Sequence, residues 1–160
     1  MTTRQHGGMV QRGAVPILLV EDNVQDIEIT RRAFKKGRLM NELFVVRDGE
    51  EALDYLFRRG RYQDPRLSPR PGLILLDVNL PKVSGLDVLR RIKEDQALRK
   101  IPVVVLTVSE RAEDIECAYD FGGNTYIQKP VEFERFLRVI NAIQDYWITI
   151  ATLPPEQSVV

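Results

Sequence analysis

The chain has 160 residues, a length that suits one domain and leaves little room for a second. Apolar residues make up 44% and charged residues 29% of the sequence, so we expect a full hydrophobic core and exclude wholesale disorder. Lys plus Arg and Asp plus Glu each total 23, and this balance argues against a bulk electrostatic binder of nucleic acid.

Cysteine and histidine each occur once. Because Cys117 has no second cysteine to pair with, the sequence excludes an internal disulfide and a multi-cysteine metal site. His6 lies in a polar N-terminal stretch, which argues against a Ser-His-Asp or Cys-His catalytic arrangement. The first apolar run, residues 15–20, is too short for a signal peptide, and no run approaches the roughly 18 residues of a membrane span. We therefore predict a cytoplasmic protein with no membrane segment.

The N-terminal half predicts two strands and two helices after a flexible tail at residues 1–14. The continuous apolar run at residues 17–20 is typical of a strand buried on both faces of a parallel sheet. Residues 24–36 carry apolar side chains at helical spacing. A second strand is expected at residues 43–46, and Asp48, with a glutamate three positions later, predicts the capped start of the next helix.

The C-terminal half continues this alternation after a proline-containing loop at residues 60–72. Strands are expected at residues 73–76 and 102–106. Ser84 and Ser109 are each placed to cap the helix that follows one of these strands.

A fifth strand at residues 125–128 and a last helix from about Glu132 complete the pattern. Five strands alternating with five helices predict the α/β class with a five-stranded parallel sheet. The helical residues that we expect to face the core are Val24, Ile27, Ala33, Phe34, Leu53, Leu56, Phe57, Leu86, Val88, Leu89, Ile92, Ala112, Ile115, Ala118, Tyr119, Phe133, Phe136, Leu137, Ile140 and Ile143.

Side chains that can do chemistry follow four of the five predicted strands, and they are Glu21, Asp22, Asp77, Thr107 and Lys129. Because ligand sites in doubly wound sheets lie outside the carboxyl ends of the strands, we expect these side chains to converge. Two carboxylates ~5 Å apart repel by about 3 kcal/mol at an effective dielectric constant of about 20, and a divalent cation would relieve that repulsion. All-oxygen ligands suit Mg²⁺, with Mn²⁺ as the alternative. A purely structural role, with the acids capping a helix and ending a strand, explains one such residue better than the whole set.

Four motifs together resemble the receiver domain of two-component response regulators. They are the acidic pair Glu21-Asp22, the segment Asp77-x-x-x-Pro81-x-x-x-Gly85, the strand-ending Thr107, and Tyr126-x-x-Lys129-Pro130. They follow the order and spacing of that family from residue 17 to about 145. The resemblance implies a flavodoxin-like receiver fold with sheet order 2-1-3-4-5, flanked by five helices.

The resemblance also implies a role for each acidic residue of the site. Asp77 would accept a phosphoryl group from the phosphohistidine of a sensor histidine kinase. Asp22, Asp77 and the backbone carbonyl of Asn79 would hold Mg²⁺, and Glu21 would act through a metal-bound water.

On the same resemblance, Lys129 and the hydroxyl of Thr107 would contact the phosphoryl oxygens. Tyr126 would be the switch aromatic, which turns inward when Thr107 moves toward the phosphoryl group. Two alternatives stay open. Tyr126 can equally be a half-buried strand tyrosine without a switching role. Val108 can either narrow the access to Asp77 or pack in the core.

The loop after the second helix is basic, and its arginines face only Asp64 in the local sequence. A loop that is solvated or faces a protein partner is favoured over a nucleic-acid site, because the charge of the chain is balanced. This loop, the segment 123–127 and the tryptophan-containing end resemble the small response regulators that pair with phytochrome kinases, so a phytochrome-type kinase is a candidate partner. The arginines are Arg58, Arg59, Arg61, Arg66 and Arg70.

An apolar segment follows the last predicted helix and consists of Tyr146, Trp147, Ile148, Ile150 and Leu153. We predict a receiver domain at residues 15–146 and a C-terminal extension at residues 147–160. The extension is expected to form part of a homodimer interface, because such an apolar surface would otherwise be exposed to water. The alternative is that it folds back on its own domain.

The sequence therefore predicts a single-domain response regulator that signals through protein–protein contacts and is not an enzyme acting on a separate substrate. A metal-dependent phosphohydrolase is the first rival. Asn79 opposes it, because an aspartate-nucleophile phosphatase would carry a second aspartate at that position. A scaffold that is never phosphorylated is the second rival, and the complete set of site residues opposes it.

Overall fold

The computed structural model describes residues 15–36 and 41–150. One parallel sheet runs through this part of the chain in the strand order β2-β1-β3-β4-β5. This order confirms the predicted fold class. The strands are β1 (Ile17–Val20), β2 (Leu43–Val46), β3 (Leu73–Leu76), β4 (Val103–Thr107) and β5 (Thr125–Gln128).

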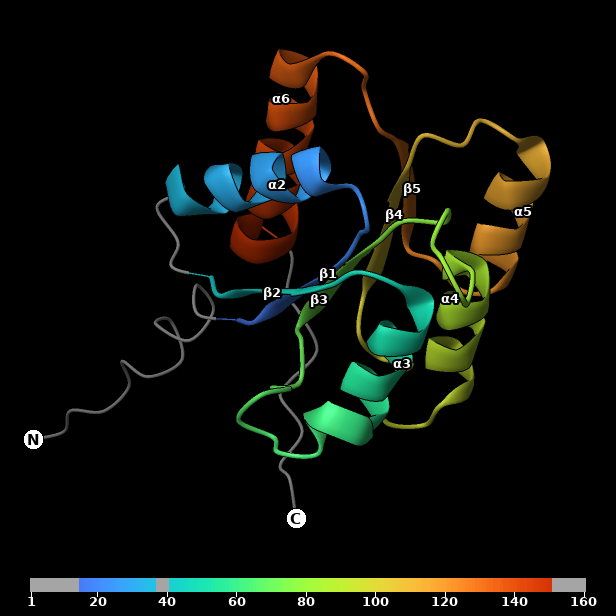
Figure 1. Cartoon of the computed structure of the whole chain (residues 1–160). Coiled ribbons are helices and arrows are strands. Elements are labelled where there is room, and N and C mark those ends of the chain that lie inside the picture. The colour runs from blue at the N-terminus through green and yellow to red at the C-terminus, as the bar shows by residue number, and fades with distance from the viewer. Residues whose placement is uncertain (1–14, 37–40, 151–160) are drawn as a thin grey trace, which may run out of the picture.

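Helices cover both faces of the sheet (Figure 1). Helices α2 (Val24–Lys36) and α6 (Phe133–Gln144) pack together on one face. Helices α3 (Gly49–Phe57), α4 (Gly85–Glu94) and α5 (Ala112–Asp120) lie on the other. A short 3₁₀ turn, η2 (Gly60–Tyr62), follows α3, and a π-helical turn, η3 (Asp145–Ile150), continues α6.

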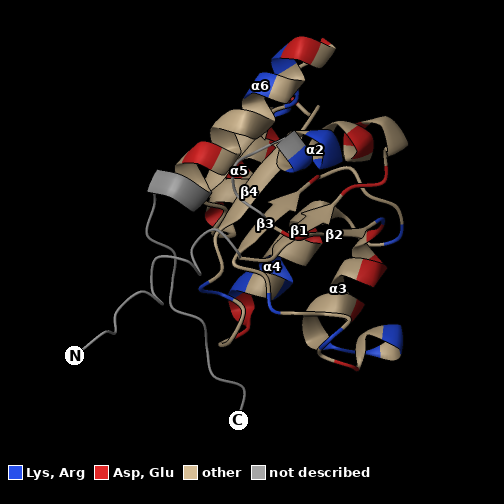
Figure 2. Cartoon of the chain, turned by 90° about the vertical axis from the view of Figure 1, so that its left-hand side faces the viewer, with Lys and Arg blue, Asp and Glu red and all other residues tan. Residues whose placement is uncertain are grey.

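The central strands β1, β3 and β4 are buried along their whole length and are almost entirely apolar, whereas the edge strands β2 and β5 are mostly half-buried. Ile17 and Leu19 of β1 face the core beneath α2 and α6, whereas Leu18 and Val20 face the core beneath α3, α4 and α5. Successive side chains of a strand point to opposite faces, so each central strand supplies both cores. Figure 2 shows the result, with charged residues on the helices and loops and none on the strands.

Four residues that we expected in the core are exposed, and one of them is Ala112, the first residue of α5. Val24 and Phe133 are the first residues of α2 and α6, and their exposed fractions are 59% and 42%. The prediction is wrong for them because helical periodicity does not show where the underlying sheet ends. Tyr119 is 52% exposed and lies beside the edge strand β5, where its hydroxyl accepts a hydrogen bond from the backbone N–H of Tyr126.

Two of the three predicted helix caps are confirmed. Asp48 accepts a hydrogen bond from the N–H of Glu51 at the start of α3. Ser84 accepts one from the third residue of α4. The cap at Ser109 is wrong, because its hydroxyl donates to the carboxylate of Asp114 at 2.6 Å and α5 begins only after Arg111.

The fourth strand lies one residue further along the chain than predicted, at Val103–Thr107. Pro102 has no N–H to donate to a strand ladder, and Thr107 pairs with Gln128 at the far end.

Within the described ranges, no helix is both long and apolar enough to cross a bilayer.

Candidate functional site

Three carboxylates meet at the carboxyl edge of the sheet. Glu21 and Asp22 follow β1, Asp77 follows β3, and one oxygen from each lies within 4.8 Å of the others. The backbone ladder extends one residue past both strands, because Glu21 donates its N–H to Val46 and Asp77 donates its N–H to Val20. These bonds fix the carboxylates side by side, as the sequence predicts.

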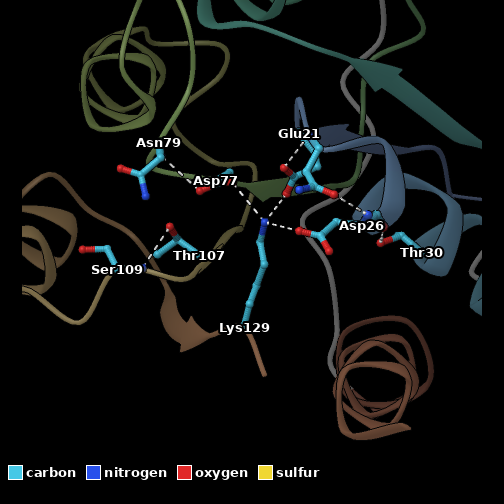
Figure 3. A network of polar contacts seen from close by, with 9 residues as sticks. Glu21, Asp26, Thr30, Asp77, Asn79, Thr107, Ser109 and Lys129 are labelled. Carbon is cyan, nitrogen blue, oxygen red and sulfur yellow. Dashed lines mark hydrogen bonds and ion pairs between the residues drawn. The ribbon is translucent and has the colours of Figure 1, made fainter. Parts of the chain in front are cut away.

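Lys129 lies beneath this cluster and follows the edge strand β5 (Figure 3). Its ammonium donates to Glu21, to Asp26 at 2.9 Å and to Asp77 at 3.0 Å. Its backbone N–H donates to the carbonyl of Thr107 at 2.7 Å, which holds the end of β5 against the end of β4. The structure thus brings together the lysine and acids that the sequence predicts.

Asp26 is a site residue that the sequence analysis misses. It lies in the first turn of α2, where the side chain of Asn23 accepts a hydrogen bond from its N–H and the hydroxyl of Thr30 donates to its carbonyl oxygen. Its carboxylate is 21% exposed and turns toward Lys129. An acidic residue in the first turn of the helix that follows Glu21 and Asp22 is the signal that could have identified it.

The site holds more negative than positive charge. Burial raises the pKa of Glu21 from 4.5 to about 7; the charge of Asp77 adds to this rise, and the bond from Lys129 opposes it. Burial alone would lower the pKa of Lys129, but the surrounding carboxylates, Asp77 and Glu21 above all, outweigh burial and raise it. The lysine therefore stays charged. Three of the four carboxylates of the site contact its ammonium, and the fourth, that of Asp22, lies beside Glu21 and Asp77.

This donor set fits a divalent cation. Three clustered carboxylates offer only oxygen atoms, which Mg²⁺ and Mn²⁺ prefer. Burial and then the charge of Asp77 raise the pKa of Glu21, and a cation would relieve the repulsion between these two carboxylates. The backbone carbonyl of Asn79 stays a predicted ligand. The N–H of Asn79 donates to Asp77 Oδ1 at 3.0 Å, while Asp77 Oδ2 faces Lys129.

Gly85 explains the spacing of the motif that begins at Asp77. A Cβ at position 85 would overlap the carbonyl oxygen of Asp77 and lie 2.7 Å from Cα of Val78. The N–H of Gly85 also donates to the carbonyl of Val78 at 2.9 Å. The start of α4 can press against the loop that carries Asp77 only because this residue has no side chain.

Thr107 and Tyr126 are linked through the loop that follows β4. The N–H of Ser109 donates weakly to the Thr107 hydroxyl oxygen at 3.4 Å, and the Tyr126 hydroxyl donates to the Ser109 carbonyl at 2.9 Å. Tyr126 is half-buried, and Thr107 is fully buried. Val108 is 56% exposed, so of its two predicted placements the core position is wrong.

The arginines of the basic loop have partners in their own domain, while the side chains of Arg61 and Arg66 remain exposed to solvent as predicted. Arg59 and Arg61 pair with Asp54 and Glu51 of α3. The other three predicted arginines also have partners in this domain: Arg58 donates to the carbonyl of Ser68, Arg66 pairs with Asp64, and Arg70 donates to the carbonyl of Leu56. The sequence of the loop itself contains only one acidic partner, Asp64, because Glu51 and Asp54 belong to the preceding helix α3.

Two aromatic residues of the C-terminal segment differ in exposure: Trp147 is packed against the domain and Tyr146 is exposed. Trp147 packs against the core beneath α2 and α6, so this part of the segment folds onto its own domain. Tyr146 is 53% exposed and meets Trp147 edge to face at 5.3 Å between ring centroids. The side chains of Ile148 and Ile150, and all of Leu153, lie outside the described residues.

Comparison with known proteins gives concordant matches. Residues 17–141 match the family model of the response regulator receiver domain. Response regulator Rcp1 from Synechocystis sp. is 39% identical over 138 residues, which cover 86% of this chain and 92% of that protein.

Solved structures agree in both sequence and fold. The phosphorylated cyanobacterial phytochrome response regulator RcpA is 42% identical, with a TM-score of 0.85 over 89% of this chain and 99% of that one. The Mn²⁺-bound form of response regulator Rcp1 is 38% identical, with a TM-score of 0.84 over 88% of this chain and 99% of that one. With the strand order and the acidic cluster described above, these matches establish that the chain belongs to the response regulator receiver domain family.

Proposed function

We propose that this receiver-domain protein accepts a phosphoryl group on Asp77 from a sensor histidine kinase and passes the signal on through altered protein–protein contacts. The proposal rests on the surroundings of the Asp77 carboxylate. Its carboxylate is buried, lies within 4.8 Å of two other acids and has Lys129 3.0 Å from Oδ2. A carboxylate is a weak nucleophile, so it needs a phosphoryl donor that is already activated.

In the proposed transfer, a carboxylate oxygen of Asp77 forms a bond to the phosphorus of a phosphohistidine. The P–N bond breaks, and its electron pair leaves with the imidazole nitrogen. The charge that develops on the phosphoryl oxygens must be stabilised. Lys129 supplies one fixed positive charge there, and the hydroxyl of Thr107 donates a hydrogen bond once it turns toward the phosphoryl group.

The proposed cation ligands are Asp22, Asp77 and the carbonyl of Asn79, with Glu21 acting through a water molecule. Mg²⁺ is the proposed cofactor and Mn²⁺ the alternative; the Mn²⁺-bound form of the relative Rcp1 supports a site of this type. The cation would offset negative charge shared by the acids and the incoming phosphoryl group.

A histidine kinase in the cytoplasm is the proposed partner, and a phytochrome-type kinase is the first candidate because the relative RcpA is a phytochrome response regulator. Exposed valines support a docking surface at the carboxyl edge of the sheet. Val24, Val108 and Val131 follow β1, β4 and β5, and their exposed fractions are 59%, 56% and 102%. Apolar side chains around a charged site can seat the kinase helix that presents the phosphohistidine.

Tyr126 is proposed to carry the response. Its bond to the carbonyl of Ser109 couples β5 to the loop after Thr107, so a movement of Thr107 toward a phosphoryl group would change the position of the tyrosine. Tyr126 lies on β5, which follows α5 and precedes α6 in the chain. We propose that the face formed by α5, β5 and α6 is used for homodimer formation.

The test is phosphorylation with a small acyl phosphate in the presence of Mg²⁺, read by mass spectrometry of the intact chain. The wild-type chain is expected to gain one phosphoryl group, whereas Asp77→Asn is expected to gain none. Asp22→Ala is expected to lose Mg²⁺ binding and phosphorylation together. Equal labelling of Asp77→Asn and the wild type would refute the assignment of the phosphoacceptor.

A further inference from the structure

The ammonium of Lys129 is shared by three carboxylates that differ in one respect. Glu21 and Asp77 belong to the acidic triplet whose oxygens lie within 4.8 Å of one another, but Asp26 does not. Figure 3 shows Asp26 on the α2 side of the lysine, opposite Thr107. Lys129 therefore has one acidic partner outside the group that fits a divalent cation.

A bound cation would change the surroundings of Lys129. The triplet oxygens that now accept from the ammonium would turn toward the cation, and the two positive charges would repel each other. Asp26 would keep its full negative charge and its contact of 2.9 Å with the ammonium. It would then be the main group attracting Lys129 into the site before the phosphoryl group arrives.

The backbone of Asp26 is well held for this role. The side chain of Asn23 accepts from its N–H at 3.0 Å, and the hydroxyl of Thr30, which is 1% exposed, donates to its carbonyl oxygen at 2.8 Å. These bonds fix the first turn of α2, so the short Asp26 side chain has little freedom to follow Lys129 elsewhere. The position of the carboxylate thus determines where the ammonium rests.

We propose that Asp26 is a positioning residue, which holds the ammonium of Lys129 beside Asp77 while a divalent cation occupies the acidic triplet. This inference rests on the proposed phosphorylation of Asp77 and assigns a residue that prepares the site for it. Asp26 neither binds the cation nor reacts, so its effect on phosphorylation passes through Lys129 alone.

Kinetics at saturating Mg²⁺ test the proposal. Asp26→Asn removes the charge at nearly constant shape and is expected to slow phosphorylation by a small acyl phosphate by about tenfold, the lower end of the range for outer-shell partners. Asp26→Glu, which keeps the charge, is expected to recover part of the rate. Glu28→Gln is the matched control, since it removes one exposed acidic charge from the same helix.

The outcomes separate this inference from the proposed function. If the wild-type chain gains no phosphoryl group on Asp77, the proposed function fails. If the wild type is labelled and Asp26→Asn reacts as fast as Glu28→Gln, the positioning role is refuted while the phosphoacceptor stands. Loss of Mg²⁺ binding in Asp26→Asn, measured by calorimetry, would place Asp26 in the cation site and also overturn the inference.

A measurement on the wild-type chain does not depend on any variant folding. Lysine-selective NMR detects scalar coupling from Nζ across a hydrogen bond to a carboxyl carbon. On addition of Mg²⁺ alone, the coupling from Lys129 to Asp26 is expected to persist, while those to Glu21 and Asp77 weaken. Loss of the Asp26 coupling on Mg²⁺ addition would contradict the inference.

Discussion

Gly85 acts on the site without offering it any functional group. The Cα of Gly85 lies so close to the backbone of Asp77 and Val78 that the Cβ of any other residue would collide with main-chain atoms. Backbone atoms cannot swing aside as the end of a flexible side chain can. The residue therefore fixes how closely the start of α4 approaches the proposed phosphoacceptor.

Gly85→Ala is expected to damage both stability and the site. Overpacking against fixed atoms typically costs about 1–3 kcal/mol, so the free energy of unfolding in urea should fall by about that amount. Phosphorylation by an acyl phosphate should slow because the loop carrying Asp77 must shift.

Gly60→Ala is the control for this prediction. Gly60 has a φ of 57°, but an added Cβ there would make only ordinary contacts, the nearest at 3.6 Å to the carboxylate of Asp54. Alanine there should cost about 1 kcal/mol through backbone strain and leave phosphorylation unchanged. Equal effects of the two substitutions on phosphorylation would contradict the steric argument for Gly85.

The sequence reveals site residues best where the backbone alone determines their position. Asp77 and Lys129 follow strands β3 and β5, and the ends of parallel strands meet at one edge of the sheet, so their convergence can be predicted. Asp26 depends on the rotation of α2 about its axis, and Ser109 depends on whether Asp114 competes for its hydroxyl. Such side-chain contacts depend on which residues the folded chain brings together, and the sequence pattern alone does not show this.

At the scale of elements, the segment between α3 and β3 is held by bonds to its own backbone. The buried Tyr55 of α3 donates its hydroxyl to the carbonyl of Pro69 at 2.8 Å. The hydroxyl of Ser68 donates to the carbonyl of Tyr62 at 2.9 Å, and the hydroxyl of Tyr62 donates to the carboxylate of Glu51. A long loop with few apolar residues gains a defined path in this way.

Tyr55→Phe is expected to lower the free energy of unfolding by about 1–2 kcal/mol, because the carbonyl of Pro69 loses its partner in a partly buried place. Tyr119→Phe is the control, since its exposed hydroxyl accepts a single bond at 3.3 Å and its loss should cost little. Urea unfolding of both variants measures the difference. A loss no larger for Tyr55→Phe than for Tyr119→Phe would show that the loop does not need this anchor.

The bounds of the elements are predictable to different degrees for a physical reason. The run at residues 17–20 matches β1 to the residue, because apolar residues end where polar ones begin at the sheet edge. The spacing at residues 24–36 likewise gives both ends of α2. The start of α5 does not follow from Ser109, since the loop after β4 contains bonds from Tyr126 and to Asp114 that only the folded chain brings together.

At the scale of the whole molecule, the proposed homodimer rests on a smaller exposed surface than the sequence suggests. Trp147 packs against its own domain, which leaves Tyr146 as the exposed aromatic residue of the described C-terminal segment. Tyr119 of α5 is exposed as well, and β5 lies between α5 and α6 in the fold. A two-fold contact that uses both tyrosines would use each of them twice.

Sedimentation of the full chain at tens of micromolar is expected to show a dimer. Replacing an aromatic anchor typically costs about 2 kcal/mol of association energy, so Tyr146→Ser should raise the dimer dissociation constant about thirtyfold. Leu67→Ser is the control, because Leu67 is 57% exposed in the loop between η2 and β3. A wild-type monomer, with or without a phosphoryl mimic, would end this proposal, and an unchanged Tyr146→Ser dimer would place the interface elsewhere.

The packing of α2 against α6 has a consequence for synthesis on the ribosome. The two helices share a core although almost a hundred residues separate them in sequence, from Lys36 to Phe133. At a translation rate of about 5–20 residues per second, the apolar face of α2 waits roughly 5–20 s for its partner. During that time β1 can already pair with β2 and β3, but one side of this early sheet has no helix to complete its cover. The nascent chain is therefore most prone to aggregate in this interval, before α6 is made and covers the apolar face of α2.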